Sequence, residues 1–99
     1  MTDTPIKVVA RVIVAPGREA AFEQHASALC VATRTEDGCL AYHLHRNPGQ
    51  PGVYVFVEDW ASRRVWEEHM SGEALRVFNA GLPAGSIAQI EIHPLVEIA

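Results

Sequence analysis

Glu58, Trp60 and His69 are the residues whose types and spacing best suit acid–base chemistry on a bound molecule. Glu58 lies between Phe56 and Trp60 on one face of an apolar segment that has the alternation of a strand. A carboxylate buried on such a face without a partner would be costly. His69 follows in the next segment, on the side of a helix expected to pack onto that strand. A carboxylate that orients an imidazole is a common general-base arrangement, so this set is a candidate catalytic site.

The same pair also has a purely structural interpretation. Glu58 and His69 can satisfy each other's hydrogen-bonding needs in a core, and Glu58 can instead pair with a backbone group, Arg11 or Arg46. Buried ionisable pairs are enriched at functional sites but are not confined to them, so both interpretations stay open.

His43 and His45 form a His-x-His pair within an alternating segment, which places both imidazoles on one face of a strand. Zinc needs three or four ligands, and the possible additions, His69 and His93, come from a helix and a distant strand. The pattern therefore favours two polar residues on a strand face, and we predict no metal site. His43 or His45 remains a second candidate base if the pocket opens on their side of the strand.

Four aromatic side chains could form the walls of a pocket for an aromatic ring, or could simply fill the core. They are Phe56, Trp60, Trp66 and Phe78. Asn79 falls on the inward side of the last helical turn, where its amide can bind a ligand oxygen or cap the helix. Tyr42 can be a second proton-transfer group, or a strand aromatic whose hydroxyl lies at the surface.

The elements that position these residues follow from hydrophobic periodicity and turn signals. Alternating or β-branched segments predict strands over 6–15, 39–46, 53–60 and 87–98. Apolar residues at helical spacing predict a helix over 18–36 and a second helix that starts after Ser62, breaks at 71–73 and resumes over 74–81. The order β-α-β-β-α-β predicts an α+β, ferredoxin-like fold: a four-stranded antiparallel sheet with both helices on one face. Ninety-nine residues make one domain, 1–99.

The predicted sheet has a second face that nothing else in the sequence can cover. The strands over 6–15 and 53–60 are apolar on both faces, and fully burying one such side chain stabilises by about 1.5–3 kcal/mol. Several exposed side chains of this kind would be unfavourable, so the patterning predicts a homodimer in which a second copy buries this face.

Composition and charge exclude some partners. The net charge is −4, the pI is about 5.6 and the eight basic residues are scattered, so a nucleic-acid surface is not expected. No apolar run approaches the roughly 18 residues of a membrane span, and we expect no membrane association. Cys30 and Cys39 lack the spacing of a metal or redox motif, and the start of the chain has no secretory pattern. We therefore expect two reduced thiols and a cytoplasmic protein.

Three stretches of this chain are similar to a known family. They are "VVARVIVAPGREAAF" near the start, "TRTEDGCLAYHLHRNP" and "YVFVEDWASRRVWEEHMSGEALRVF". In this order and spacing they resemble the antibiotic biosynthesis monooxygenase (ABM) domain proteins, which include small quinol monooxygenases. The resemblance covers nearly the whole chain. It implies a dimeric α/β barrel with a pocket between the sheet and helices of each subunit.

The resemblance also implies an activity and a set of residues. Quinol-oxidising members use O2 on electron-rich phenols, quinols or anthrones with neither metal nor flavin, so no cofactor is expected. They carry a Glu-x-Trp followed by a helix-borne His, similar to Glu58, Trp60 and His69 here. Related members degrade haem, isomerise a small phosphorylated signal or have no known reaction. Haem degradation is not expected, because Asn79 and Ala10 stand where those relatives place their histidine and asparagine.

These observations lead to one principal hypothesis and two alternatives. The principal hypothesis is a cofactor-independent monooxygenase that oxidises a small electron-rich aromatic with O2, with His69 as base and Glu58 orienting it. The first alternative is a dimer that binds a small molecule without catalysis, since one fold hosts unrelated functions. The second is an isomerase that uses the same acid–base pair without oxygen.

Overall fold

The computed structural model describes residues 4–99, and its elements follow the predicted order. They are β1 (Ile6–Val14), α1 (Glu19–Thr33), β2 (Cys39–Arg46), β3 (Val53–Trp60), α2 (Arg63–Met70), α3 (Glu73–Gly81) and β4 (Ile87–Leu95). The second predicted helix is two short helices, α2 and α3, separated at the expected Ser71 and Gly72. Ser62 caps α2, because its hydroxyl accepts a hydrogen bond from the backbone N–H of Val65 at 3.3 Å.

The four strands form one antiparallel sheet in the order β2-β3-β1-β4. This is the ferredoxin-like topology predicted from the sequence. Pro94 lies opposite Val8 on the edge strand β4, a position that tolerates a residue without a backbone N–H.

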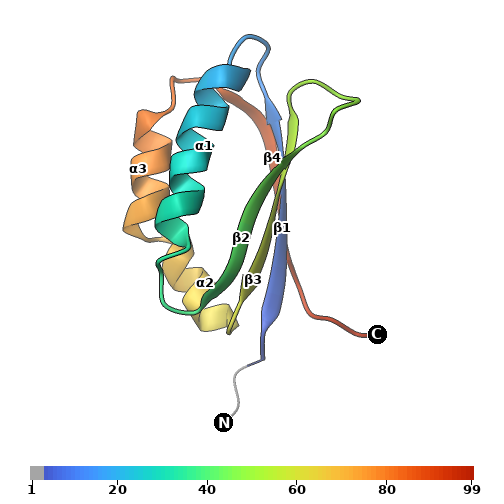
Figure 1. The fold of residues 1–99 in the computed structure, drawn as a ribbon, viewed down its shortest axis with the longest axis vertical. Helices are drawn as coiled ribbons and strands as arrows, with labels where there is room; N and C mark the ends of the chain where they lie inside the picture. The colour runs from blue at the N-terminus through green and yellow to red at the C-terminus, as the bar shows by residue number, and fades with distance from the viewer. Residues whose placement is uncertain (1–3) are drawn as a thin grey trace.

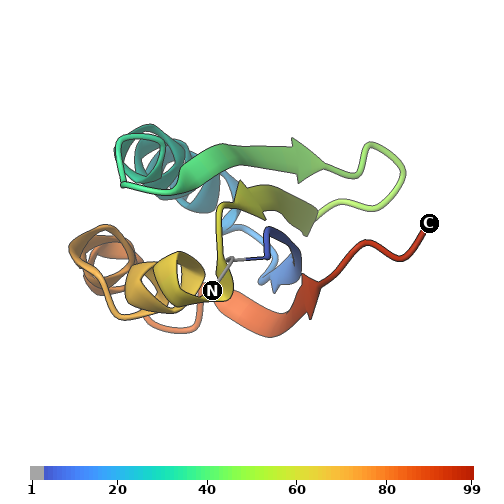
Figure 2. The ribbon, with the colours of Figure 1, turned by 90° about the horizontal axis from the view of Figure 1, so that it is seen from below.

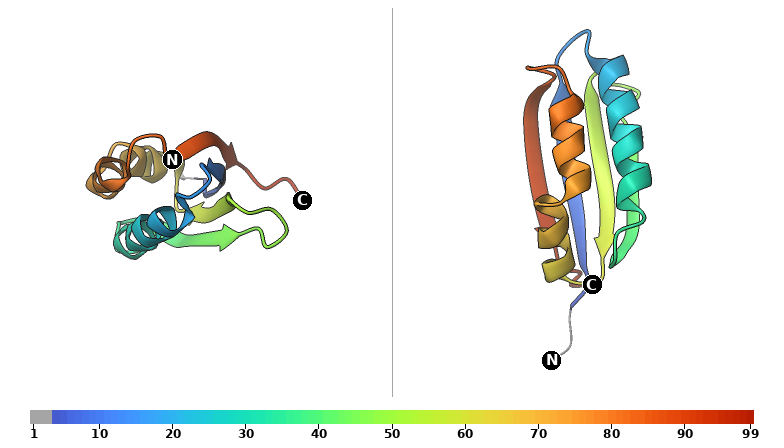
Figure 3. Two further views of the ribbon diagram at one scale, coloured as in Figure 1. Left: turned by 90° about the horizontal axis from the view of Figure 1, so that it is seen from above. Right: turned by 90° about the vertical axis from the view of Figure 1, so that its left-hand side faces the viewer.

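All three helices pack on one face of the sheet (Figure 1 and Figure 3, right). Seen along the strands, the helices form one layer and the sheet the other (Figure 2). No helix or strand within residues 4–99 covers the opposite face of the sheet. The predicted arrangement of two layers is confirmed, and the sheet has one face inside and one face outside.

The core lies between the two layers and follows the alternation of the central strands. On β1 the side chains of Val8, Ala10 and Val12 are buried, and on β3 those of Phe56, Glu58 and Trp60 are buried. Helix α1 contributes a buried stripe that includes Phe22, Ala26 and Leu29. Because successive side chains of a strand point to opposite faces, the buried carboxyl of Glu58 is held in an otherwise apolar layer.

Several local features differ from the sequence prediction, among them β1, which ends at Val14 rather than residue 15. Helix α1 ends at Thr33 rather than residue 36, and β4 ends at Leu95 rather than residue 98. After Thr33 the chain tightens, because the N–H of Glu36 bonds to the carbonyl of Thr33 at 2.9 Å. Leu40, predicted to share a face with Tyr42, is exposed because the β2–β3 register shifts between Cys39 and Ala41.

The turn between α1 and β2 depends on Gly38. Its φ is +83°, a left-handed conformation that glycine adopts without strain. A Cβ at this position would lie 2.7–2.9 Å from the side chain of Val65 on α2. The N–H of Ala61 also bonds to the carbonyl of Gly38 at 2.8 Å. These contacts hold the turn against the start of α2.

Cys30 is a buried free thiol, and Cys39 is a partly buried one. Burial raises the pKa of both thiols, so both resist ionisation. Across residues 4–99 no helix is long and apolar enough to cross a membrane.

Candidate functional site

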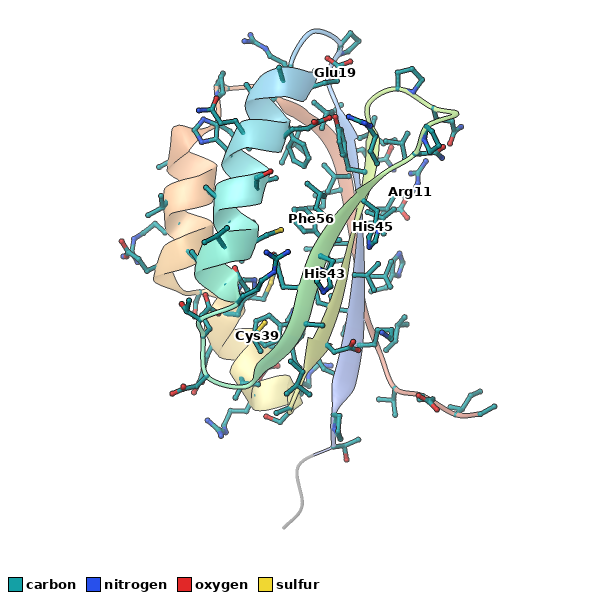
Figure 4. The ribbon with its side chains drawn as sticks, in the orientation of Figure 1. Arg11, Glu19, Cys39, His43, His45 and Phe56 are labelled. Atoms are coloured by element: carbon teal, nitrogen blue, oxygen red, sulfur yellow. The ribbon has the colours of Figure 1, made fainter. Side chains whose placement is uncertain are left out.

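A cavity of about 170 Å3 lies between the helix layer and the sheet. Most of its lining is apolar and comes from all four strands and all three helices. Seven of the nine predicted site residues line it: Tyr42, Phe56, Glu58, Trp66, His69, Phe78 and Asn79. A concave, mostly apolar site with a few converging polar groups is the usual form of a small-molecule site. Figure 4 shows one wall, Phe56, in the space between α1 and the sheet.

Glu58 supplies the carboxyl group of this cavity. Only 4% of the residue is exposed, and its Oε1 accepts a hydrogen bond from the indole Nε1 of Trp60 at 2.9 Å. Burial raises the pKa of Glu58 to about 7, and the Trp60 hydrogen bond opposes that shift. Near neutral pH this group can therefore either donate or accept a proton.

His69 supplies the imidazole, and its partner is not the predicted one. Its Nδ1 lies 2.9 Å from Oε1 of Glu36, in the turn after α1, whereas Glu58 bonds to Trp60. Burial lowers the pKa of His69, and the Glu36 carboxylate opposes that shift. The predicted interaction between Glu58 and His69 is thus wrong. Both side chains line one cavity, but Glu58 bonds to Trp60 and His69 bonds to Glu36.

Trp60 stands behind the site rather than in its lining. It is fully buried, and its ring centroid is 4.7 Å from that of His69 and 6.1 Å from that of Tyr42. It was predicted as a wall for the ligand. The structure instead gives it contacts that hold the carboxyl of Glu58 and the ring of His69 in place.

The other polar groups of the cavity differ in how they are satisfied. Tyr42 is 2% exposed, and burial, reinforced by Glu58, raises the pKa of its phenol, which stays protonated at neutral pH. Within the described residues, the indole Nε1 of Trp66 is buried without a hydrogen-bond partner, which leaves a donor available. Asn79 lines the cavity but is exposed, so its amide lies at the rim.

His43 and His45 lie outside the cavity. Both are exposed, and they follow one another along β2 (Figure 4). The cross-strand partner of His43 on β3 is Val57, which lies on the outer face of the sheet. Nη2 of Arg34 lies 3.4 Å from Nδ1 of His43. The structure therefore does not bring the second candidate base to the site. Within residues 4–99, no three His, Cys, Asp or Glu side chains gather in a way that could hold a metal ion.

Glu36 is the site residue that sequence reasoning missed. The only role assigned to its segment was to end the first helix, and Glu36 is 33 residues away from His69. The signal that points to it is the Gly38 turn, because a left-handed glycine two residues later folds the chain back toward α2.

A larger groove of about 370 Å3 lies between α1 and α3, with His25, Ala28 and Val77 among its lining. It contains no buried carboxyl and no buried imidazole. Buried ionisable groups with perturbed pKa values are the better indicator of a functional site, so the cavity around Glu58 and His69 is the candidate.

The fold and the cavity define a ferredoxin-like α+β protein with a ligand-sized site that holds a buried carboxyl and a buried imidazole. Residues 5–81 match the family model described as antibiotic biosynthesis monooxygenase. The chain therefore belongs to the antibiotic biosynthesis monooxygenase family, as its sequence resemblance predicted.

Two relatives illustrate the similarity. "Putative monooxygenase Rv0793" of Mycobacterium tuberculosis is 33% identical over 66 residues, which are 67% of this chain and 64% of that protein. The crystal structure of PA3566 from Pseudomonas aeruginosa superposes with a TM-score of 0.89 at 28% identity, over 100% of this chain and 99% of that one. The structure of Rv0793 gives a TM-score of 0.86 at 25% identity, over 97% of each chain.

Proposed function

We propose that this protein is a cofactor-independent monooxygenase that oxidises a small electron-rich aromatic, of quinol, phenol or anthrone type, with O2. One observation carries the proposal. An imidazole and a carboxyl, both buried and both with perturbed pKa values, line the same aromatic-walled cavity. Membership of the monooxygenase family and the name of the relative Rv0793 support the reaction class.

His69 is the base in this proposal. Its lowered pKa keeps the imidazole neutral near pH 7, so it can accept a proton from the substrate. Side chains are poor electron donors, and redox enzymes usually rely on a cofactor for that reason. Here the deprotonated substrate is the electron donor, and O2 is the acceptor.

The reaction balances without a further reductant. For an anthrone-type substrate, the methylene group between the two aromatic rings reacts with O2 to give a carbonyl group and one molecule of water. The substrate loses four electrons, one oxygen atom enters the new carbon–oxygen double bond, and the other leaves as water with the two hydrogens of the methylene carbon. In this proposal His69 takes the first of these protons, and Glu58, half-protonated near pH 7, supplies a proton to the departing oxygen.

The size and lining of the cavity support a small aromatic substrate. Its volume of about 170 Å3 is close to that of an apolar cavity known to hold benzene, about 150 Å3, so it has room for one aromatic ring. In this proposal the further rings of a fused substrate extend past Ile90 and Ile92, an exposed part of the lining. Phe56, Trp66 and Phe78 supply aromatic walls, and the rings of such walls favour stacked or edge-to-face contacts with a bound ring.

The active form in this proposal is a homodimer. On the outer face of the sheet Val9, Val55 and Val57 are only partly buried in a single chain, and a second copy would cover them. The two free cysteines are in keeping with a reducing compartment, so we place the reaction in the cytoplasm.

Oxygen uptake tests the proposal. Purified, chelator-treated protein is mixed with reduced naphthoquinols and anthrones, and the rate is compared with autoxidation without protein. Uptake above that background supports the proposal. Binding of these compounds with no uptake supports a binding dimer, and product formation that persists without oxygen supports an isomerase.

A further inference from the structure

The side chain of His69 lines two separate hollows of the molecule. One is the cavity described above. The other is a surface groove of about 320 Å3, lined among others by Glu36, Glu68 and Glu73. Among residues 4–99, His69 is the one side chain that lines both. Its imidazole thus lies between the cavity and this groove.

In the hydrogen bond between His69 and Glu36, the donor and the acceptor can be assigned. The His69 side chain is 1% exposed and that of Glu36 is 27% exposed, so a buried ring meets a carboxylate that reaches water. An ionised carboxylate only accepts hydrogen bonds. The Nδ1 of His69 must therefore carry the proton of this 2.9 Å bond, which leaves Nε2 as the nitrogen able to accept one.

Glu36 is held in place before any ligand binds. The backbone N–H of Glu36 bonds to the carbonyl of Thr33 at 2.9 Å, and its own carbonyl accepts from the N–H of Cys39 at 3.2 Å. The Gly38 turn next to it contacts Val65 on α2, four residues before His69. Because the backbone of Glu36 is fixed, only its side-chain torsions have to be ordered when the carboxylate binds the imidazole.

Four acidic side chains line the groove, and two of them are paired with arginines, Glu68 with Arg64 and Glu73 with Arg76. The other two are Glu36 and Asp37, while Glu58 lines the cavity together with His69, and the ring centroid of Tyr42 is 5.3 Å from that of His69. The lining of both spaces, within residues 4–99, includes no lysine or arginine. Burial disfavours a positive charge on His69, and the carboxylate of Glu36 is the group that opposes this effect.

We propose that Glu36 is the positioning residue of this site: it holds His69 in the tautomer that carries hydrogen on Nδ1, and it stabilises the imidazolium that forms when Nε2 accepts a proton from the substrate. The catalytic half of this inference rests on the proposed function. The tautomer half does not, because it concerns the protein without substrate.

Histidine NMR tests the tautomer half. The His69 signals are identified by their loss in His69→Gln, and the nitrogen shifts of wild-type protein report which ring nitrogen carries hydrogen. We expect the Nδ1–H form in wild type. Glu36→Gln should lower the pKa of His69 further, because the opposing carboxylate charge is lost. Glu68→Gln, in the same groove but paired with Arg64, should leave both properties unchanged.

Two results would overturn the tautomer half: the Nε2–H form in wild type, or a His69 pKa that Glu36→Gln leaves unchanged. The first measurement needs no substitution, so it stands even where a variant folds poorly. Glu36→Asp, which keeps the charge, provides a second variant and should preserve more of the wild-type pKa than Glu36→Gln does.

Kinetics tests the catalytic half, with a substrate identified by oxygen uptake. Glu36→Gln should lower kcat by about tenfold or more with little change in KM, and should move the acid limb of the kcat–pH profile to lower pH. If Glu36→Gln loses thermal stability but the acid limb of its kcat–pH profile stays where it is in wild type, Glu36 has only a structural role. That result would overturn this half. If wild type consumes no oxygen, the proposed function fails, while the NMR result still decides the role of Glu36 toward His69.

Discussion

Tyr42 and Glu58 are direct cross-strand partners on β2 and β3, and both line the same cavity. Side chains opposite each other on one sheet face are close neighbours. The two groups respond to burial in different pH ranges. The phenol of Tyr42 stays protonated under ordinary conditions, because burial raises its pKa above an already high value, whereas the pKa of Glu58 is about 7. Glu58 is thus the group of this pair that changes charge near neutral pH.

The first prediction concerns stability as a function of pH. The folded protein keeps the Glu58 proton up to a pKa of about 7, against an ordinary value of 4.5. The folded state therefore binds more protons than the unfolded chain between these values, and stability falls as pH rises through this window. Each pKa unit corresponds to about 1.4 kcal/mol, so a rise from 4.5 to about 7 limits the loss to about 3.5 kcal/mol. Glu58→Gln should remove it.

Denaturant unfolding of wild type and Glu58→Gln from about pH 4.5 to about pH 8.5, a range that brackets the two pKa values of Glu58, checks this prediction. His69 has a lowered pKa and acts in the opposite direction in acid, but it is present in both proteins, so their difference reports Glu58. We expect Glu58→Gln to gain stability over wild type as pH rises. A constant difference across the range would contradict a raised pKa for Glu58.

The second prediction compares the two tryptophans. Trp60→Phe removes the indole N–H that bonds to the buried carboxyl of Glu58, and a buried group left without its partner costs about 1–3 kcal/mol. Trp66→Phe removes an N–H that has no partner among the described residues. Because the volume lost is the same, the free energy of unfolding should fall more for Trp60→Phe. Equal losses would mean that the Trp60–Glu58 bond adds no stability.

Much of the fold is predictable because the side chains of a strand with one buried face alternate between the core and the outer surface along the sequence. The alternation along β1 and β3 and the position of Pro94 at an edge follow directly from the sequence. The exposure of Leu40 does not follow, because the register shift at the start of β2 depends on how the preceding turn meets β3. No pattern in the residues around Leu40 records that shift.

The sequence predicts which side chains of the candidate site point toward the core, but it does not predict which hydrogen bonds they make. Periodicity places Glu58, Trp60 and His69 toward the core, and all three are there. It does not determine which neighbour each polar group selects. Trp60 bonds to Glu58 two residues earlier on its own strand, and His69 bonds to Glu36 in a turn 33 residues away. Such choices depend on rotamers and on loop geometry, which a pattern of hydrophobicity does not contain.

The third prediction tests which space binds the ligand. Ala10 lines the cavity from β1 and is 5% exposed, so Ala10→Leu should place a branched side chain inside it. Ala28 lines the groove between α1 and α3 and is exposed, which makes Ala28→Leu a matched control. We expect ligand affinity, measured by calorimetry, to fall by about tenfold or more for Ala10→Leu alone. A loss confined to Ala28→Leu would move the site to the groove.

The fourth prediction concerns the outer face of the sheet. Val57 lies on this face, between Val9 of β1 and His43 of β2. In the proposed homodimer Val57→Asp would bury an unpaired charge between two sheets, which is strongly unfavourable. Sedimentation velocity should show a dimer for wild type and a monomer for Val57→Asp. Val77→Asp, at an exposed position on α3, should remain a dimer. A monomeric wild type would refute the assembly.

The fifth prediction concerns the base itself. His69→Gln keeps a polar side chain of similar reach but cannot accept a proton near neutral pH, so turnover should fall by about a hundredfold or more. His25→Gln is the matched control, because His25 lies on α1 and lines the α1–α3 groove rather than the cavity. Both variants should keep the assembly of wild type, checked by sedimentation. If His69→Gln consumes oxygen at the wild-type rate, proton removal by His69 is not part of the reaction, and Glu58, which is half-ionised near pH 7, becomes the remaining base in the cavity.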